Sequence, residues 1–198
     1  MKNIILIFTA ALLMSISSFG QDSEIYKTRE IYWLGIDYNH CYFITSYDFP
    51  SPSELYNRLG AWNVLIFNER DKYLDKSFPN KHVTIASNFI NQLNTDVNIK
   101  SQIVDDLSKT NHLTETDIPD IVKKYNIPSD LTGIGLILIA ESYSKPDEKG
   151  YYYIAFIDLK SKKVLATEKM SGKVGGFSFR NYWARTYYNV LKQVGKRY

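Results

Sequence analysis

A glycine-rich loop followed by an arginine is the stretch of this chain whose residue types best suit ligand binding. The loop is Gly172-Lys-Val-Gly-Gly176, and Arg180 lies in the first turn of the helix expected after it. Free N–H groups and the positive end of a helix dipole attract phosphate or carboxylate, and a guanidinium can bind either group through two hydrogen bonds. We therefore predict an anion or partner contact at this corner, formed by Gly172, Lys173, Gly175, Gly176, Arg180 and Asn181.

A structural role for the same corner is the competing interpretation. The spacing of the glycines matches neither the P-loop nor the dinucleotide-binding fingerprint. Glycine accepts a positive φ at little cost, so these residues would reverse the chain between a strand and a helix. Arg180 and Asn181 would then hold the corner instead of a ligand.

Reactive side chains also gather at Asp37, His40 and Cys41, where a metal or a nucleophile has to be considered. Adjacent residues of a strand point to opposite faces, so His40 and Cys41 cannot easily share one ion. His82 and His112 have no partner ligands at a metal-binding spacing. We expect no metal site and no cofactor, a buried and inert Cys41, and no catalytic residue that a motif identifies.

Two carboxylate-bearing segments are expected to be structural. Asp158 lies between two predicted strands, where an Asx side chain accepts hydrogen bonds from backbone N–H groups two or three residues onward. The segment Glu69-Arg-Asp-Lys72 lies on a predicted helix, and a solvated face with local ion pairs explains it.

The elements that would position the predicted site follow one another in the last third of the chain. Gly133 to Ala140 is a short apolar run rich in β-branched residues, which is typical of a buried strand. Tyr151–Asp158 and Val164–Met170 repeat the extended pattern on either side of a charged turn, which predicts a three-strand antiparallel meander. Phe177 to Val194 then has a broad apolar face at helical spacing, with Trp183 on it.

The N-terminal half is expected to supply a long β segment and a long helix. Glu30 to Thr45 predicts one strand, or two strands joined by a turn near Asp37 to Asn39. Ser51-Pro-Ser-Glu54 has the form of a capping box with proline at the first helical position. Trp62 lies on the apolar stripe that follows, so it is expected in the core, as Trp183 is.

Together these elements predict a single α/β domain with a mixed, mostly antiparallel sheet. A C-terminal three-strand meander completes the sheet, and a long helix of the N-terminal half and a closing C-terminal helix pack against it.

The amino terminus has the features of a secretory signal peptide. Lys2 precedes an apolar run from Ile4 to Ile16, which is shorter than the roughly 20 residues needed to span a bilayer. Small residues follow at the positions expected before a cut. We predict cleavage before Gln21, a single domain over residues 21–198, and a periplasmic or secreted protein without a transmembrane segment.

Charge and cysteine content narrow the classes of partner. Loss of Lys2 with the leader lowers the formal net charge from +3 to +2, with 23 basic against 21 acidic residues, and this near-neutrality argues against nucleic acid. Basic residues gather late in the chain. A solvated face explains them, and attraction to anionic envelope polymers or lipid headgroups is the sharper alternative. Cys41 is the only cysteine, so no intramolecular disulfide can form.

The stretch from Gly133 to Val194, with its Ile-Asp-Leu-Lys-Ser-Lys-Lys-Val-Leu turn, resembles a group of envelope modules. These are the α/β modules of the curli-secretion lipoprotein CsgG, the penicillin-binding-protein activator LpoB and the TolB amino-terminal domain, in their C-terminal halves. The whole chain also resembles small exported bacterial proteins that carry Arg180-Asn-Tyr-Trp-Ala184 after a glycine-rich loop. The resemblance implies a cell-envelope module, and the absence of the lipidated cysteine of CsgG and LpoB argues against a lipid anchor.

Two functional classes are open on these grounds. The first is a non-catalytic exported module that binds another envelope protein or an anionic polymer through its sheet edge or aromatic surface. The second is a small secreted hydrolase or transferase whose residues are not recognisable by spacing. We favour the first class, because no motif supplies an activated nucleophile, a metal cage or a cofactor loop.

Overall fold

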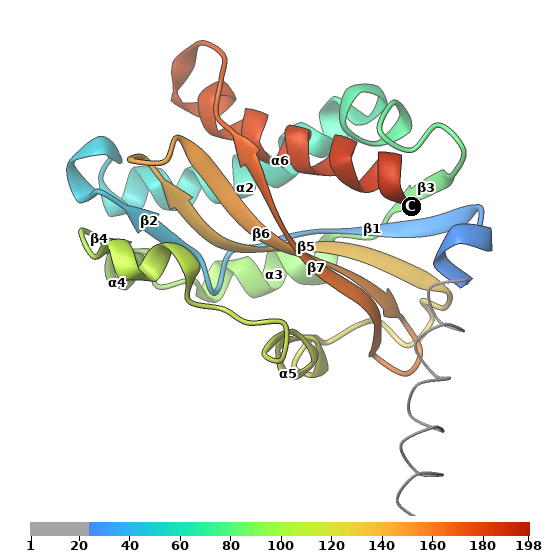
Figure 1. Cartoon of the computed structure of the whole chain (residues 1–198). Helices are drawn as coiled ribbons and strands as arrows, with labels where there is room; N and C mark the ends of the chain where they lie inside the picture. Colours follow the sequence, from blue (N-terminus) through green and yellow to red (C-terminus); the bar gives the residue numbers. More distant parts are fainter. Residues whose placement is uncertain (1–23) are drawn as a thin grey trace, which may run out of the picture.

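The computed structural model of the chain describes residues 24–198. The predicted leader and its cleavage before Gln21 lie outside these residues. Within residues 24–198, no helix is both long enough and apolar enough to cross a bilayer. The described chain forms one mixed α/β domain, in which helices cover both faces of a seven-stranded sheet (Figure 1).

The strand β5 is the centre of the sheet. Along one edge it pairs first with β1 and then with β2, both in parallel. Along its other edge it pairs antiparallel with β6, which pairs antiparallel with β7. The strands are β1 (Glu30–Asp37), β2 (Tyr42–Ile44), β3 (His82–Ile85), β4 (Ile103–Val104), β5 (Ile134–Ser144), β6 (Lys149–Asp158) and β7 (Lys163–Lys173).

The predicted mixed α/β class and the three-strand meander are confirmed, but the mostly antiparallel sheet is not. Among the described residues, four of the six strand pairings are parallel, since β3 joins β1 and β4 joins β2 in parallel as well. The physical reason is the helical connections of the N-terminal half. A helix between two strands returns the chain to the same end of the sheet, which makes the strands parallel.

Two long helices cover one face of the sheet. They are α2 (Pro52–Asn68), which continues into the π-helical turn η2 (Asp71–Asp75), and α6 (Ser178–Arg197). The other face carries α3 (Asn88–Leu93) and α5 (Ile118–Lys123) (Figure 1). Each face has its own cluster of buried apolar side chains, so the sheet separates two cores.

Shorter elements complete the middle of the chain and the turn after β2. They are η1 (Ser46–Asp48), η3 (Asn94–Asp96), α4 (Ile99–Gln102) and η4 (Leu107–Asn111).

The helix α2 starts at the predicted position, with Ser51 as its N-cap. The Ser51 hydroxyl accepts a hydrogen bond from the Glu54 N–H at 3.4 Å, and Pro52 begins the helix. Trp62 on α2 and Trp183 on α6 are both buried core residues, as predicted. Their rings lie 5.3 and 5.1 Å from the ring of Tyr143 on β5, so one aromatic cluster joins both helices to the central strand.

Glycines allow α6 to lie unusually close to its neighbours. A Cβ added at Gly172 of β7 would lie 2.7 Å from the carbonyl carbon of Thr186 on α6. A Cβ at Gly195 would lie 2.6 Å from the carbonyl carbon of Ser77, which follows η2. Neither backbone leaves room for a side chain, so these two contacts fix α6 between β7 and the end of the α2 segment.

Candidate anion-binding site

The corner predicted from the sequence opens onto a cavity of about 290 Å³ between η2 and the start of α6. We call this cavity the α6 pocket. Four residues of the predicted site line it, namely Gly175, Gly176, Arg180 and Asn181. The structure therefore brings these four residues to one cavity. The same cavity is also lined by Glu69, Lys72 and Tyr73, about a hundred residues earlier in the chain.

The loop between β7 and α6 shapes the mouth of the α6 pocket. Gly176 has a φ of +99°, and Ser178 has a φ of +69°, which is uncommon for a residue with a side chain. Between them Phe177 is 94% exposed. Phe177 is also the N-cap of α6 and offers no side-chain hydrogen bond there, so no side chain at the cap position competes with a ligand for the first N–H groups of the helix.

Three cationic side chains surround one aromatic ring at the pocket. The Tyr188 ring centroid lies 5.3 Å from the Arg185 guanidinium carbon, 5.5 Å from Lys192 Nζ and 6.0 Å from Lys72 Nζ. Cation–π attraction holds each cation near the ring. Lys72 of η2 and Arg185 of α6 line the pocket itself, so two elements distant in sequence bring positive charge to one cavity.

Only part of this charge is neutralised by the protein itself. Glu69 lines the pocket and lies 2.6 Å from Lys72 Nζ. Burial opposes the charge of Lys72, but the hydrogen bond to Glu69, the neighbouring Tyr73 and the charge of Glu69 together outweigh it and raise the lysine pKa. Among the described residues, the Arg180 side chain donates to the amide oxygen of Asn181 alone, at 3.2 Å. Within residues 24–198, neither Arg180 nor Arg185 forms an ion pair with a carboxylate.

The other two predicted site residues line a different surface of α6. Gly172 and Lys173 line a shallow groove between β7 and α6, which we call the β7–α6 groove. Gly172 serves there as the close-packing residue against Thr186. The predicted corner is thus divided by α6 into two neighbouring surfaces, so its six residues do not all face one cavity.

The site predicted from the sequence does not include Lys72, Arg185 or Tyr188. Lys72 was assigned to a solvated charge cluster, and nothing in its local pattern links it to a loop so far away in the chain. The sequence does contain a pattern that points to Arg185 as part of a cationic surface, because the chain has no acidic residue after Glu168. The thirty residues that follow include seven basic ones, which are Lys169, Lys173, Arg180, Arg185, Lys192, Lys196 and Arg197.

The turn that contains Asp37, His40 and Cys41 has structural contacts. The Asp37 carboxylate accepts hydrogen bonds from the Tyr125 hydroxyl at 2.8 Å and from the Asn39 N–H at 2.9 Å. Burial raises the pKa of the Cys41 thiol, as expected of an inert cysteine, and burial lowers the pKa of His40. No group of three potential metal-ligating side chains occurs in the part of the chain that the structure describes.

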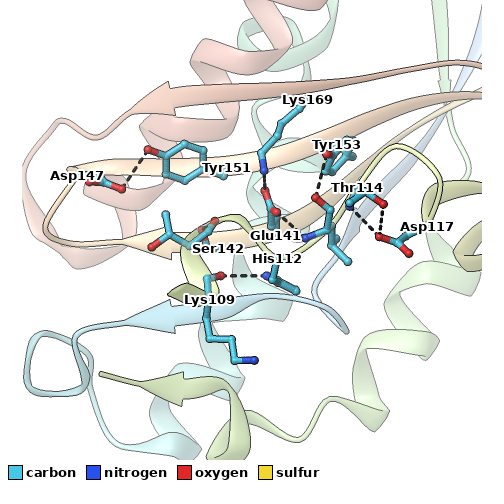
Figure 2. Close-up of polar contacts among 12 residues, drawn as sticks. Lys109, His112, Thr114, Asp117, Glu141, Ser142, Asp147, Tyr151, Tyr153 and Lys169 are labelled. Atoms are coloured by element: carbon cyan, nitrogen blue, oxygen red, sulfur yellow. Dashed lines mark hydrogen bonds and ion pairs between the residues drawn. The ribbon is translucent and has the colours of Figure 1, made fainter. Parts of the chain in front are cut away.

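A buried carboxylate, Glu141, lies where β5 changes its neighbour from β1 to β2, and the register with β6 shifts at this position. Such switch points often carry ligand sites. Here, however, the contacts of Glu141 are internal (Figure 2). One oxygen accepts the Leu113 N–H at 2.8 Å, and the other lies 2.6 Å from Lys169 Nζ on β7.

Two further hydrogen bonds attach the same segment to the sheet. The Ser142 hydroxyl donates to the Thr110 carbonyl at 2.7 Å, and the Tyr153 hydroxyl donates to the Leu113 carbonyl at 3.1 Å. Glu141 and these contacts therefore fasten η4 and the loop after it to β5 and β6. We call this arrangement the Glu141 latch, and we assign it to the fold.

Comparison with known proteins does not assign a function to this site. No protein-family model matches the chain, and no curated protein matches it. Among solved structures, it is similar to a protein from Helicobacter pylori described as a "putative neuraminyllactose-binding hemagglutinin homolog". The identity is 12% over 86% of this chain and 83% of that one, with a TM-score of 0.36. A similarity of this size supports no inference about function, so the site has to be interpreted from its own residues.

Proposed function

We propose that this protein is an exported, non-catalytic envelope module that binds an anionic group of a protein or polymer partner through the α6 pocket. One observation carries the proposal. Two arginines, Arg180 and Arg185, line the same cavity, and neither forms an ion pair with a carboxylate within residues 24–198. The predicted leader and the resemblance to envelope modules supply the cellular setting.

The chemistry of the pocket favours carboxylate or phosphate over an uncharged ligand. A guanidinium presents planar paired donors that match both groups. Asn181 adds an amide, and the uncapped start of α6 adds backbone N–H groups. Because Arg180 and Arg185 are exposed, their attraction is screened by salt. We therefore expect moderate affinity that falls as ionic strength rises.

Thermal unfolding in the presence of anions tests the proposal. Phosphate and polyglutamate would be compared with chloride at equal ionic strength, since a ligand that binds only the folded state raises the melting temperature. Arg180→Gln is expected to abolish the anion-dependent shift and to leave the melting temperature without ligand nearly unchanged. Lys160→Gln is the matched control, because it removes one positive charge from an exposed position in the turn between β6 and β7.

Two results would contradict the proposal. The unmutated protein would show no shift beyond that of chloride, or Arg180→Gln would lower the melting temperature while the shift with anions persists. In the second case Arg180 holds the corner of the fold, as the competing interpretation states.

A further inference from the structure

We propose that the α6 pocket and the β7–α6 groove form one continuous cationic track that binds a linear acidic polysaccharide. This inference rests on the proposed function and extends it, because it names the class of ligand and adds a second binding surface. The track is made of Lys173, Arg180, Arg185, Lys192 and Lys196.

The exposed face of α6 sets the direction of the track. Arg185, Lys192 and Lys196 are separated by seven and then four residues. At 100° per residue these positions fall within roughly 40° of one another around the helix axis, and their Cα atoms are roughly 10 and 6 Å apart along it. All three are exposed. They therefore form a row along the solvent side of α6, and no acidic residue interrupts this helix.

Lys192 connects the two surfaces. Its ammonium lies 5.5 Å from the centroid of Tyr188, which lines the α6 pocket. Lys192 also lines the β7–α6 groove, together with Lys173 and Lys196. From Arg180 to Lys196 the helix rises roughly 24 Å. A linear ligand that follows the track can therefore contact several cations in a row.

Lysine side chains line the β7–α6 groove, and amide side chains of α6 occupy two backbone carbonyl oxygens of β7. Gln193 donates to the carbonyl of Ser171, and Asn189 donates to the carbonyl of Lys173, each at 3.0 Å. Both carbonyls belong to β7, which pairs only with β6 in the described sheet. A peptide strand that added to this edge would need such carbonyls free, so the groove favours an anionic polymer over an added β-strand.

Two cations near the end of the track already form ion pairs within the fold, so the track does not extend to them. Lys169 is engaged by Glu141, and Arg197 is engaged by Glu168. In contrast, the five track residues make no ion pair within residues 24–198. Their charges are therefore open to a ligand that carries negative charge.

Aromatic and amide side chains favour a sugar polymer over a bare phosphate chain. The exposed Phe177 ring offers an apolar face beside Arg180 at the α6 pocket. Pyranose rings have apolar faces of their own that pack on aromatic rings, and their hydroxyls can hydrogen-bond to amides such as Asn181. A polyphosphate has charge but neither of these features.

Binding of oligogalacturonates of increasing length to the full mature chain tests the inference by calorimetry. We expect affinity to rise with length until the oligomer spans the track and then to level off. The groove variant Lys192→Gln/Lys196→Gln should keep binding the shortest oligomers but lose most of the gain with length, tenfold or more. The salt dependence of its affinity should also weaken, because two fewer cations attract the polyanion. The control Lys160→Gln/Lys163→Gln, at the far end of β7, should behave as the unmutated protein.

Several outcomes would overturn the inference. If long oligomers bind no more tightly than short ones, or if the groove variant keeps the full gain with length, the track is wrong while the α6 pocket still stands. If neither short nor long oligomers bind, and phosphate and polyglutamate also fail to stabilise the protein, the proposed function itself fails. If polyphosphate shows the expected length dependence and oligogalacturonate does not, the assignment to an acidic polysaccharide is overturned.

Discussion

A methyl group added at Gly172 would be forced into the backbone of α6. The Cβ of an alanine at this position would lie 2.7 Å from the carbonyl carbon of Thr186, 2.9 Å from its Cα, and closer still to its carbonyl oxygen. These atoms belong to a helix backbone and cannot rotate away as a side chain can. Relief requires α6 to move away from β7, which loosens the apolar contacts beneath it, including those of Trp183.

Gly175→Ala is the matched comparison, because it is the same substitution three residues further on, in the loop after β7. There the added Cβ would lie 3.4 Å from the Arg185 Cγ, at the distance of ordinary van der Waals contact. Overpacking costs about 1–3 kcal/mol, which lowers the melting temperature of a domain of this size by about 2–12 °C. We expect this loss for Gly172→Ala and a change within about 1 kcal/mol for Gly175→Ala.

Scanning calorimetry of the unmutated protein, Gly172→Ala and Gly175→Ala measures the difference in melting temperature. Equal melting temperatures for the two alanine variants would refute the reasoning, because the close approach of α6 to β7 would then not be a constraint. The same measurement separates a packing role of Gly172 from a ligand role, since no ligand is present in the assay.

Three further predictions concern the core, the latch and the amino terminus. Trp183→Ala should destabilise the protein by about 3–5 kcal/mol in urea, because its side chain is fully packed between α6 and β5. An unchanged urea midpoint would show that this packing is wrong. Lys169→Met should lower stability by about 3 kcal/mol, because it leaves the buried Glu141 carboxylate without its ammonium partner. The double variant Glu141→Gln/Lys169→Met should be more stable than Lys169→Met alone, and the reverse order would contradict the latch. Mass spectrometry of the protein from its native host should find Gln21 at the amino terminus, and an intact Met1 would contradict the predicted leader.

Elements defined by neighbouring residues were predictable from the sequence. The capping box at Ser51 marks the start of α2, and Asp158 anchors the β6–β7 turn through the Ser161 N–H at 2.7 Å. The meander itself follows from apolar runs separated by short charged turns. In each case the physical cause acts over a few residues, so one segment of sequence contains all of it.

The parallel half of the sheet could not be predicted in the same way. Residues of β1 such as Tyr32 pair with β5 at Gly135, and an apolar run does not specify which distant strand it will join. The apolar pattern identifies both strands as buried, but it leaves their order and direction undetermined. An antiparallel arrangement was expected because the visible meander has one.

The candidate site was predictable only on the side that one loop supplies. Gly175, Gly176 and Arg180 follow from the loop and the helix start, whereas Lys72 reaches the pocket because α2 and η2 pack beside α6. That packing depends on buried side chains such as Tyr73, which lies 5.4 Å from Tyr187 of α6. The charge cluster around Lys72 looked like a solvated surface because its neighbour in space is not its neighbour in sequence.

The central place of β5 has a consequence for the order in which the chain folds. Contacts between β1 and β5 join residues about one hundred positions apart, whereas β5, β6 and β7 follow one another through short turns. Long-range pairing has to close a large loop first, which slows folding. The meander is therefore expected to form early and to act as the template on which β1 and β2 later assemble. Until β5 has been synthesised, the N-terminal strands lack the partner that holds them together, and this delay suits a chain that is predicted to cross a membrane before it folds.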